Sequence, residues 1–250
     1  NAGEIVVTTP SLTLDNGLIT TSTSGAGAAG SILVNATTIG VTGGGQLSSS
    51  STGTATGAAG TVTLEGLTPN TLATSVTLTN GKLLTSAAGS GAGGNIVVRA
   101  PSVTLAENAS ISATSNSGNA GSLTLTDAAT LTSTNSSLTT EATTGAGGSI
   151  ALKGTTALDL TGTTVSATVK GGSQPGGNIT LTAPTVTIAG GSVTAETAGA
   201  GNAGDVTVNA TSIGLQGGAQ LSTSSRGAGK GGPIVVQGLT GAGSQAASLT

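Results

Sequence analysis

A glycine recurs every 27 to 34 residues along this chain, and aliphatic side chains stand two and four residues after each one. The glycines are Gly3, Gly30, Gly60, Gly94, Gly121, Gly148, Gly177, Gly204 and Gly232. The residue between the two aliphatic positions varies, and such alternation indicates a half-buried β-strand. Repeats of this length are typical of solenoids, in which each turn of chain stacks on the next. We take the following aliphatic residues to mark the predicted core: Ile5, Val7, Ile32, Val34, Ile96, Val98, Ile179, Leu181, Val206 and Val208.

Two further segments follow the first in each coil. The second carries another aliphatic pair, such as Leu12 and Leu14, and only the coil from Gly121 breaks it, with Ser133 after Leu131. The third follows turn residues such as Asn16-Gly17 and has one aliphatic and one small inward position. The sequence therefore predicts an all-β, right-handed parallel β-helix (β-solenoid) with three short strands per coil and about 8–9 coils of about 28 residues. The glycine-rich corners are expected to turn at positive φ.

The pattern runs through residues 1–250 without a linker, which predicts a single β-solenoid segment. It starts and stops in mid-pattern, so we expect the segment to be excised from, or continuous with, a longer repeat array. A three-coil block is also visible. Its first coil has a proline (Pro10, Pro101 and Pro184), and its second coil has an Asn-Ala-Thr corner (at Asn35 and Asn209). Its third coil has a glycine six residues after the coil glycine (Gly66, Gly154 and Gly238). In the middle block Asp127-Ala128 replaces the Asn-Ala-Thr corner.

Composition excludes most kinds of functional site. The chain has 44 Gly, only 6 Lys and Arg and 9 Asp and Glu, and no His, Cys, Met or aromatic residue. Imidazole, thiol and aromatic chemistry are therefore missing, and we expect no metal, no small-molecule cofactor and no catalytic site. The four aspartates, which a polysaccharide-cleaving enzyme would need to cluster, fall in different coils and columns. A net charge of −3 argues against nucleic acid, and no run reaches the ~20 apolar residues needed for membrane insertion.

Two outward features and one glycine motif remain. The outer face of the third strand is nearly all Ser and Thr, and its candidate interaction residues are Thr20, Ser48, Ser112, Ser166, Thr194 and Ser222. Glu65 and Arg99 occupy the same column in consecutive coils, which predicts a weak, solvent-facing ion pair. Segments such as Gly25-Gly27-Gly30 match GxGxxG, but each leads into a strand rather than a helix, so we interpret them as part of the repeat.

The repeat resembles the β-helical shafts of filamentous-haemagglutinin-like exoproteins of bacterial two-partner secretion. The likeness rests on blocks such as the residues from Gly177 to Pro184 and from Ala200 to Val208. It implies export and folding outside the cell as an adhesive fibre. We therefore expect a non-enzymatic, extracellular shaft of a bacterial surface or secreted protein, whose partners are copies of itself or cell-surface and matrix ligands. The alternative is a subunit of a self-assembling extracellular fibre or sheath that stacks end to end.

Overall fold

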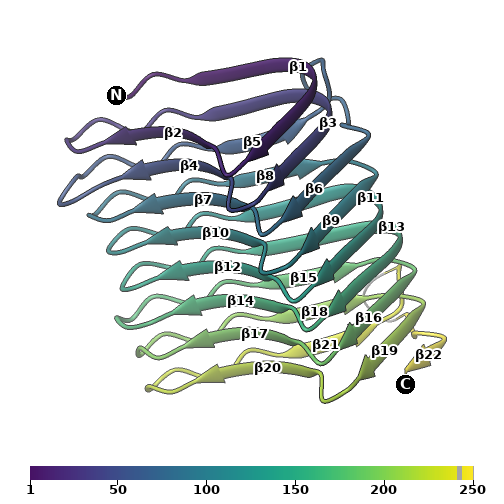
Figure 1. The fold of residues 1–250 in the computed structure, drawn as a ribbon. Coiled ribbons are helices and arrows are strands. Elements are labelled where there is room, and N and C mark those ends of the chain that lie inside the picture. Colours follow the sequence, from purple (N-terminus) through teal and green to yellow (C-terminus); the bar gives the residue numbers. More distant parts are fainter. Residues whose placement is uncertain (241–243, 250) are drawn as a thin grey trace.

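The chain winds into a stack of β-strand coils. The computed structural model describes residues 1–240 and 244–249, and every regular element within them is a β-strand (Figure 1). We number the coils by their leading glycines, from coil 1 at Gly3 to coil 8 at Gly204; coil 9 begins at Gly232. Each strand pairs in parallel with the strand one coil away, so the coils form a β-solenoid of about eight turns.

Each coil contributes to three faces, and the strands are named here by face. Four strands run through both the first and second faces: β1 (Ile5–Asp15), β3 (Ile32–Thr42), β11 (Leu123–Thr134) and β13 (Ile150–Thr161). Other strands of the first face are β5 (Val62–Glu65), β8 (Ile96–Arg99), β15 (Ile179–Thr182), β18 (Val206–Asn209) and β21 (Ile234–Gln237). Other strands of the second face are β6 (Ser75–Thr79), β9 (Ser102–Ala106), β16 (Thr185–Ala189), β19 (Ser212–Gln216) and β22 (Ser248–Leu249).

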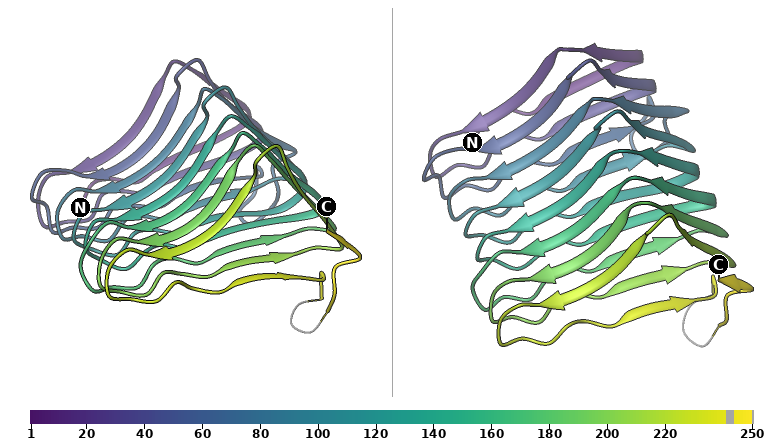
Figure 2. Two further views of the ribbon diagram at one scale, coloured as in Figure 1. Left: turned by 90° about the horizontal axis from the view of Figure 1, so that it is seen from below. Right: turned by 60° about the horizontal axis from the view of Figure 1, so that its bottom comes forward.

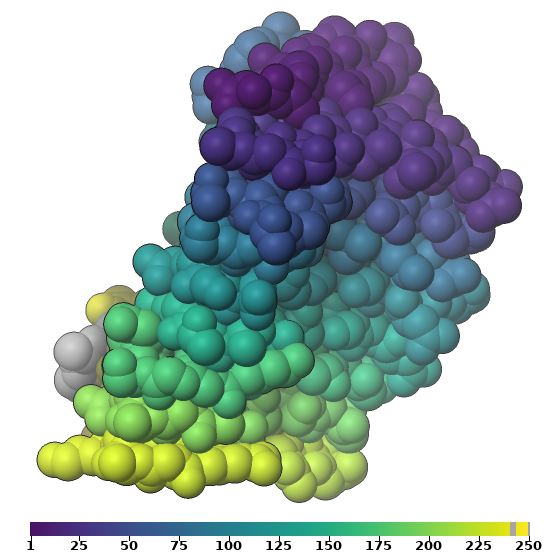
Figure 3. Space-filling model, turned by 90° about the vertical axis from the view of Figure 1, so that its left-hand side faces the viewer, coloured from purple at the N-terminus to yellow at the C-terminus, as the bar shows by residue number. Residues whose placement is uncertain are grey.

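The third face is a separate eight-stranded sheet. Its strands are β2 (Leu18–Thr23), β4 (Gln46–Ser51), β7 (Lys82–Ala87), β10 (Ser110–Ser115), β12 (Ser137–Ala142), β14 (Thr164–Val169), β17 (Ser192–Thr197) and β20 (Gln220–Ser225). Seen from below, the faces enclose a triangle, and the chain turns counterclockwise as it approaches the viewer, so the coil is right-handed as predicted (Figure 2). Each coil forms a continuous band on the surface, stacked from purple to yellow (Figure 3).

The first corner differs from the expectation of three separate strands. In coils 1, 2, 5 and 6 the first and second strands join into one long strand that bends. Pro10 lies at this bend in β1. The residues on either side of it pair with β3, Thr9 with Ala36 and Ser11 with Thr38. The register of β1 with β3 continues around this corner, whereas in coil 5 Asp127 has a φ of 67° and the pairing of β11 with β13 is irregular.

The second corner turns sharply through left-handed residues; these are glycines in some coils, as predicted, but in Asn16-Gly17 and Asn80-Gly81 the left-handed residue is the asparagine. Asn16, Asn80 and Asn135 have φ values of 48°, 53° and 48°, and Gly162 and Gly190 have values of 57° and 62°. Asn and Gly tolerate this conformation better than other residues. A stack of such turns directs each chain from the second face onto the third.

The recurring coil glycines have a different role from the one expected, because none of them from Gly30 to Gly232 lies at positive φ. A Cβ atom on Gly94 would collide with the carbonyl oxygen of Gly60 in the coil before, and a Cβ on Gly121 would collide with that of Gly94. The same contact recurs along the column. A second column, which includes Gly57 and Gly91, repeats this close approach. The GxGxxG segments thus supply two lines of backbone-to-backbone packing at the third corner.

The interior is filled by the aliphatic columns. Of the residues predicted to mark the core, these eight are fully buried: Ile32, Val34, Ile96, Val98, Ile179, Leu181, Val206 and Val208. Ile5 and Val7 pack against the same core but are only half-buried, because coil 1 has a neighbour on one side only. Full burial of one such side chain contributes ~1.5–3 kcal/mol, so the stacking of coils supplies most of the stability.

The small inward residues of the third face satisfy the backbone of the glycine corner. The hydroxyl of Thr85 donates to the carbonyl of Gly94 at 2.5 Å, and that of Thr140 donates to Gly148 at 2.6 Å. Where coil 5 lacks its second aliphatic residue, buried Ser133 lies 2.9 Å from the hydroxyl of Thr163. These buried hydroxyls have partners, which avoids the cost of about 1–3 kcal/mol for an unsatisfied group, whereas the buried hydroxyl of Ser51 has none.

Candidate functional site

The predicted interaction face lies on the outside of the third sheet but is less open than expected. Thr20 is exposed, and Ser112, Ser166, Thr194 and Ser222 are half-buried. Ser48 does lie on the outer side of its strand, but it is buried, with only 8% of its surface exposed, so it is not an accessible contact residue as predicted. The register places it between Thr20 and Leu84. In-register strands ~4.8 Å apart shield one another's side chains.

Hydroxyl groups on this face bond to one another across coils. Thr139 donates to Ser112 at 3.0 Å, and Thr194 donates to Ser166 at 3.3 Å. Near the C-terminal ends of its strands this face carries two ion pairs: Lys170 to Glu141 at 2.6 Å, and Arg226 to Glu196 at 3.6 Å. Each pair joins neighbouring coils, and each is solvent-exposed enough to contribute only ~0–1 kcal/mol. The face is therefore a polar surface whose hydroxyls are partly satisfied by their neighbours.

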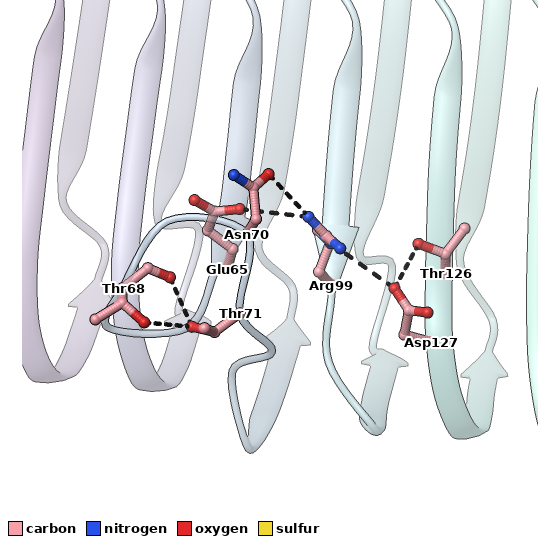
Figure 4. Close-up of polar contacts among 7 residues, drawn as sticks. All are labelled: Glu65, Thr68, Asn70, Thr71, Arg99, Thr126 and Asp127. Atoms are coloured by element: carbon pink, nitrogen blue, oxygen red, sulfur yellow. Dashed lines mark hydrogen bonds and ion pairs between the residues drawn. The ribbon is translucent and has the colours of Figure 1, made fainter.

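Most charge on the first corner converges on Arg99, at the end of β8 (Figure 4). Its guanidinium lies 3.9 Å from the carboxylate of Glu65 in coil 3 and 3.7 Å from that of Asp127 in coil 5. It also donates a 3.2 Å hydrogen bond to the side-chain oxygen of Asn70. One arginine thus joins three successive coils, as suits a planar group with five donors.

Asn70 belongs to a loop, residues 66–73, that accounts for the 34-residue interval between Gly60 and Gly94. The loop is closed by its own backbone, since the amide of Gly66 donates to the carbonyl of Thr71 at 3.0 Å and the amide of Thr71 to that of Thr68 at 3.1 Å. The Thr71 hydroxyl also donates to the Thr68 carbonyl at 2.6 Å. Arg99 anchors the tip of this loop to the next coil (Figure 4).

Glu65 corrects one sequence prediction, because it is only 5% exposed and does not face solvent. The 66–73 loop begins at the next residue and lies beside it (Figure 4). On its other side the register partner is Asn35 in coil 2, which is also 5% exposed. The side-chain oxygen of Asn35 is buried without a hydrogen-bond partner. A carboxylate has no N–H to offer it, so the two acceptors lie in adjacent strands without a donor between them.

Sequence reasoning missed Asn70 and Asp127 as members of this cluster. Asp127 has a φ of 67°, and the pairing of β11 with β13 shifts register on either side of Ala128. The only available signals were indirect: the long interval that contains Asn70, and the replacement of the Asn-Ala-Thr corner by Asp127-Ala128. A bulge of this kind redirects a side chain, here towards Arg99.

A second unpredicted device is a set of asparagines at the third corner. Each accepts, through its side-chain oxygen, a hydrogen bond from a backbone amide one coil further on. The residues are Asn1, Asn95, Asn119, Asn178 and Asn202, with bond lengths of 2.8 to 3.0 Å. Their signal in the sequence is position, since each lies two residues before or one after a coil glycine. They contribute to coil stacking.

Within residues 1–240 and 244–249, no group of three or more carboxylates gathers closely enough to hold a metal ion. The same residues include no helix long and apolar enough to cross a membrane. Comparison of the chain with protein-family models, with curated proteins and with solved structures gave no match. The structure by itself shows a β-solenoid built from a repeat of about 28 residues.

Proposed function

We propose that this chain is a segment of a non-enzymatic, extracellular β-helical shaft, of the filamentous-haemagglutinin-like kind, that gives a bacterial surface protein reach and adhesive capacity. The observation that carries the proposal is the unbroken parallel pairing from β1 to β21 along the first face. Such a stack is rigid along its axis, because each coil shares its core with both neighbours. At ~4.8 Å per coil, the rod extends about 40 Å.

The arrangement of charge and of small residues supports the same proposal. Arg99, Lys170 and Arg226 each join side chains in neighbouring coils. The glycine columns and the asparagine bonds also act between coils. Polar groups on this molecule are thus used mainly to hold one coil on the next, as a structural rod requires. The chain has no cysteine, so no disulfide links its coils.

The test is adhesion by displayed rods. Bacterial cells that present the chain on their surface should attach to host cells or matrix proteins more strongly than cells that present Ile179→Asp, which places a charge in the core and prevents folding. A control, Thr180→Asp, places the same charge on the half-buried outer side of the same strand and should keep the fold. Equal attachment by the intact chain and the Ile179→Asp variant contradicts an adhesive role of the folded rod.

A second candidate, a subunit of a fibre that stacks end to end, is favoured by the apolar surface of the terminal coils. Of the inward column, Ile5 and Val7 are only half-buried in coil 1, and Ile234 and Val236 are 43% and 37% exposed in coil 9. Open strand edges beside apolar side chains favour further pairing. Sedimentation of the purified chain distinguishes the two: concentration-dependent polymers support stacking, and a monomer at every concentration contradicts it.

A further inference from the structure

Three second corners in this solenoid share one tight turn but differ in sequence. In coils 2, 4 and 8 the turn is closed by a backbone hydrogen bond over four residues: Gly45 to Thr42 at 2.7 Å, Ala109 to Ala106 at 3.1 Å, and Ala219 to Gln216 at 3.0 Å. Both central residues have positive φ, as in a type I′ turn. In coils 2 and 8 they are Gly43-Gly44 and Gly217-Gly218, and in coil 4 they are Glu107-Asn108, at 54° and 66°.

Glycine adopts this conformation freely, whereas glutamate does so at a cost. The same molecule shows that two glycines make the turn, so the turn itself does not require Glu107. Residues held in unfavourable conformations tend to lie at functional sites, where the side chain is needed. The question is therefore what the Glu107 side chain faces.

Glu107 lines a shallow hollow of about 610 Å³ that spans the second corners of coils 4, 5 and 6. It lies where β9, β11 and β13 end and β10, β12 and β14 begin (Figure 1). Asn108, Asn135 and Ser137 also line it. Gly162 also lines it, next to Asn135, because a Cβ atom on Gly162 would collide with the Asn135 side-chain oxygen. Because Glu107, Asn108 and Asn135 are exposed, the hollow can contact one side of a small ligand but not enclose it.

The polar groups in this hollow have capacity to spare. Within the described part of the chain, the Glu107 carboxylate, the side-chain amides of Asn108 and Asn135 and the Ser137 hydroxyl form no hydrogen bond or ion pair with the protein. The backbone around them is held in place, since the backbone amide of Asn108 donates to the backbone carbonyl of Asn135 at 2.9 Å. The site thus offers a carboxylate, two amides and a hydroxyl on a rigid corner.

This set of groups fits a ligand that both donates and accepts hydrogen bonds. The carboxylate accepts from hydroxyl groups, and each amide offers a donor and an acceptor. None of the lining residues is cationic, which disfavours phosphate or sulfate, and a single carboxylate is too little charge for tight binding of a cation. We infer that the hollow binds a neutral saccharide unit. With no aromatic side chain to stack on the ring, the affinity is weak, on the order of 1–10 mM.

The inference rests on the proposed adhesive shaft, for which it names a ligand class. Glucose, galactose, mannose and N-acetylglucosamine, each titrated to about 100 mM, are the probes. The ¹⁵N-labelled chain should show saturable amide shifts at residues 107–110 and 135–138 for at least one of them, while the Gly43-Gly44 turn stays unchanged as an internal reference. The titration to about 100 mM is sufficient to saturate a site with the expected millimolar dissociation constant.

Two variants keep the fold and remove the site, because glycine occupies the same turn positions elsewhere. Glu107→Gly and Asn135→Gly should each weaken saccharide binding at least tenfold, and Glu107→Gly should also raise the melting temperature by relieving the backbone. Asn16→Gly is the matched control: Asn16 has the same φ of 48° as Asn135 but lies in coil 1, so binding should not change.

Four outcomes overturn the inference: no saturable shift with any of the four sugars, shifts located elsewhere, binding that survives Glu107→Gly, or a response to calcium chloride alone. The last outcome identifies a cation site instead. Failure here leaves the shaft proposal standing, because adhesion of displayed rods is measured separately. Conversely, loss of adhesion in Ile179→Asp says nothing about the hollow, since that variant does not fold.

Discussion

The outer edge of the first face carries corresponding columns of residues in coils 1–3 and coils 7–9, and their hydrogen bonding differs. In coils 7–9, Asn209 donates to the Thr182 hydroxyl at 3.2 Å and accepts from the Gln237 amide at 2.7 Å. In coils 1–3, Thr8 and Asn35 take the first two places and Glu65 the third. There the Asn35 oxygen is buried without a partner.

The difference comes from one functional group. An amide both donates and accepts, so Gln237 continues the ladder back to Asn209; a carboxylate only accepts, so Glu65 ends the ladder and lies instead 3.9 Å from Arg99 in the following coil. The backbone register is the same in both columns. A β-solenoid thus fixes which side chains are neighbours, and their chemistry decides which neighbour each one bonds.

The largest effect should come from Arg99→Met, which leaves the nearly buried Glu65 carboxylate without its cation and releases Asn70. We expect the free energy of local opening at β5 and β8 to fall by ~2–3 kcal/mol, measured by amide hydrogen exchange. Arg226→Met is the matched control, since the Arg226 side chain is 72% exposed and should change opening by less than ~0.5 kcal/mol. A similarly small effect at Arg99 would contradict its role as an anchor.

The second largest effect should come from Gln237→Glu, which gives the column in coils 7–9 the same acceptor-only side chain that Glu65 provides in coils 1–3. The Asn209 oxygen loses its donor, and we expect a loss of ~1 kcal/mol in the opening free energy of β18 and β21 by hydrogen exchange. Gln216→Glu makes the same chemical change at an exposed position and should have almost no effect. Equal protection in the two variants would show that the Gln237 bond contributes little.

The reverse change, Glu65→Gln, should repair the column in coils 1–3. The new amide can donate to the Asn35 oxygen, and Arg99 keeps Asn70 and Asp127, so we expect a gain of ~0.5–1 kcal/mol in stability. In this background Arg99→Met should cost less than ~1 kcal/mol, which a double-mutant cycle measures. A loss of stability in Glu65→Gln alone would mean that the ion pair outweighs the missing hydrogen bond.

The smallest effect is expected for Asp127→Ala. The Asp127 side chain is 43% exposed and lies 3.7 Å from Arg99, so its removal should lower stability by ~0–0.5 kcal/mol. Melting curves at low and high salt test this, and the small difference from the unsubstituted chain should vanish at high salt. A loss above ~1 kcal/mol would show that the bulge at Asp127 needs the carboxylate for its shape.

Periodicity was enough to predict the core, because Ile179 or Val206 must face inward in any strand that alternates with polar residues and stacks on identical neighbours. It was not enough for the glycines. Gly94 is needed for the approach of another backbone from the coil before, and sequence alone does not distinguish that from a need for positive φ. The outward direction of the third-strand Ser and Thr residues could be read from the alternation, but the burial of Ser48 depends on its neighbours in adjacent coils, and the role of this face in interaction stays a prediction.

The Arg99 cluster, too, could be predicted from the sequence only in part. The shared column of Glu65 and Arg99 could be read from their spacing, but the burial of Glu65, the reach of Asn70 and the turn of Asp127 all depend on an insertion and a bulge. Likewise, Glu107 is an ordinary residue in the sequence, and only its φ and the hollow beside it single it out.

The sequence by itself determined the repeat, the strands, their parallel stacking and the inward columns, because a two-residue alternation renewed every coil has one way to bury its aliphatic side chains. The tertiary structure alone decided the shape of the first corner, the function of the glycine columns, and which polar groups end up satisfied, buried or free. Those depend on distances between atoms in neighbouring coils, and a linear pattern specifies neighbours but not the few tenths of an ångström that separate contact from collision.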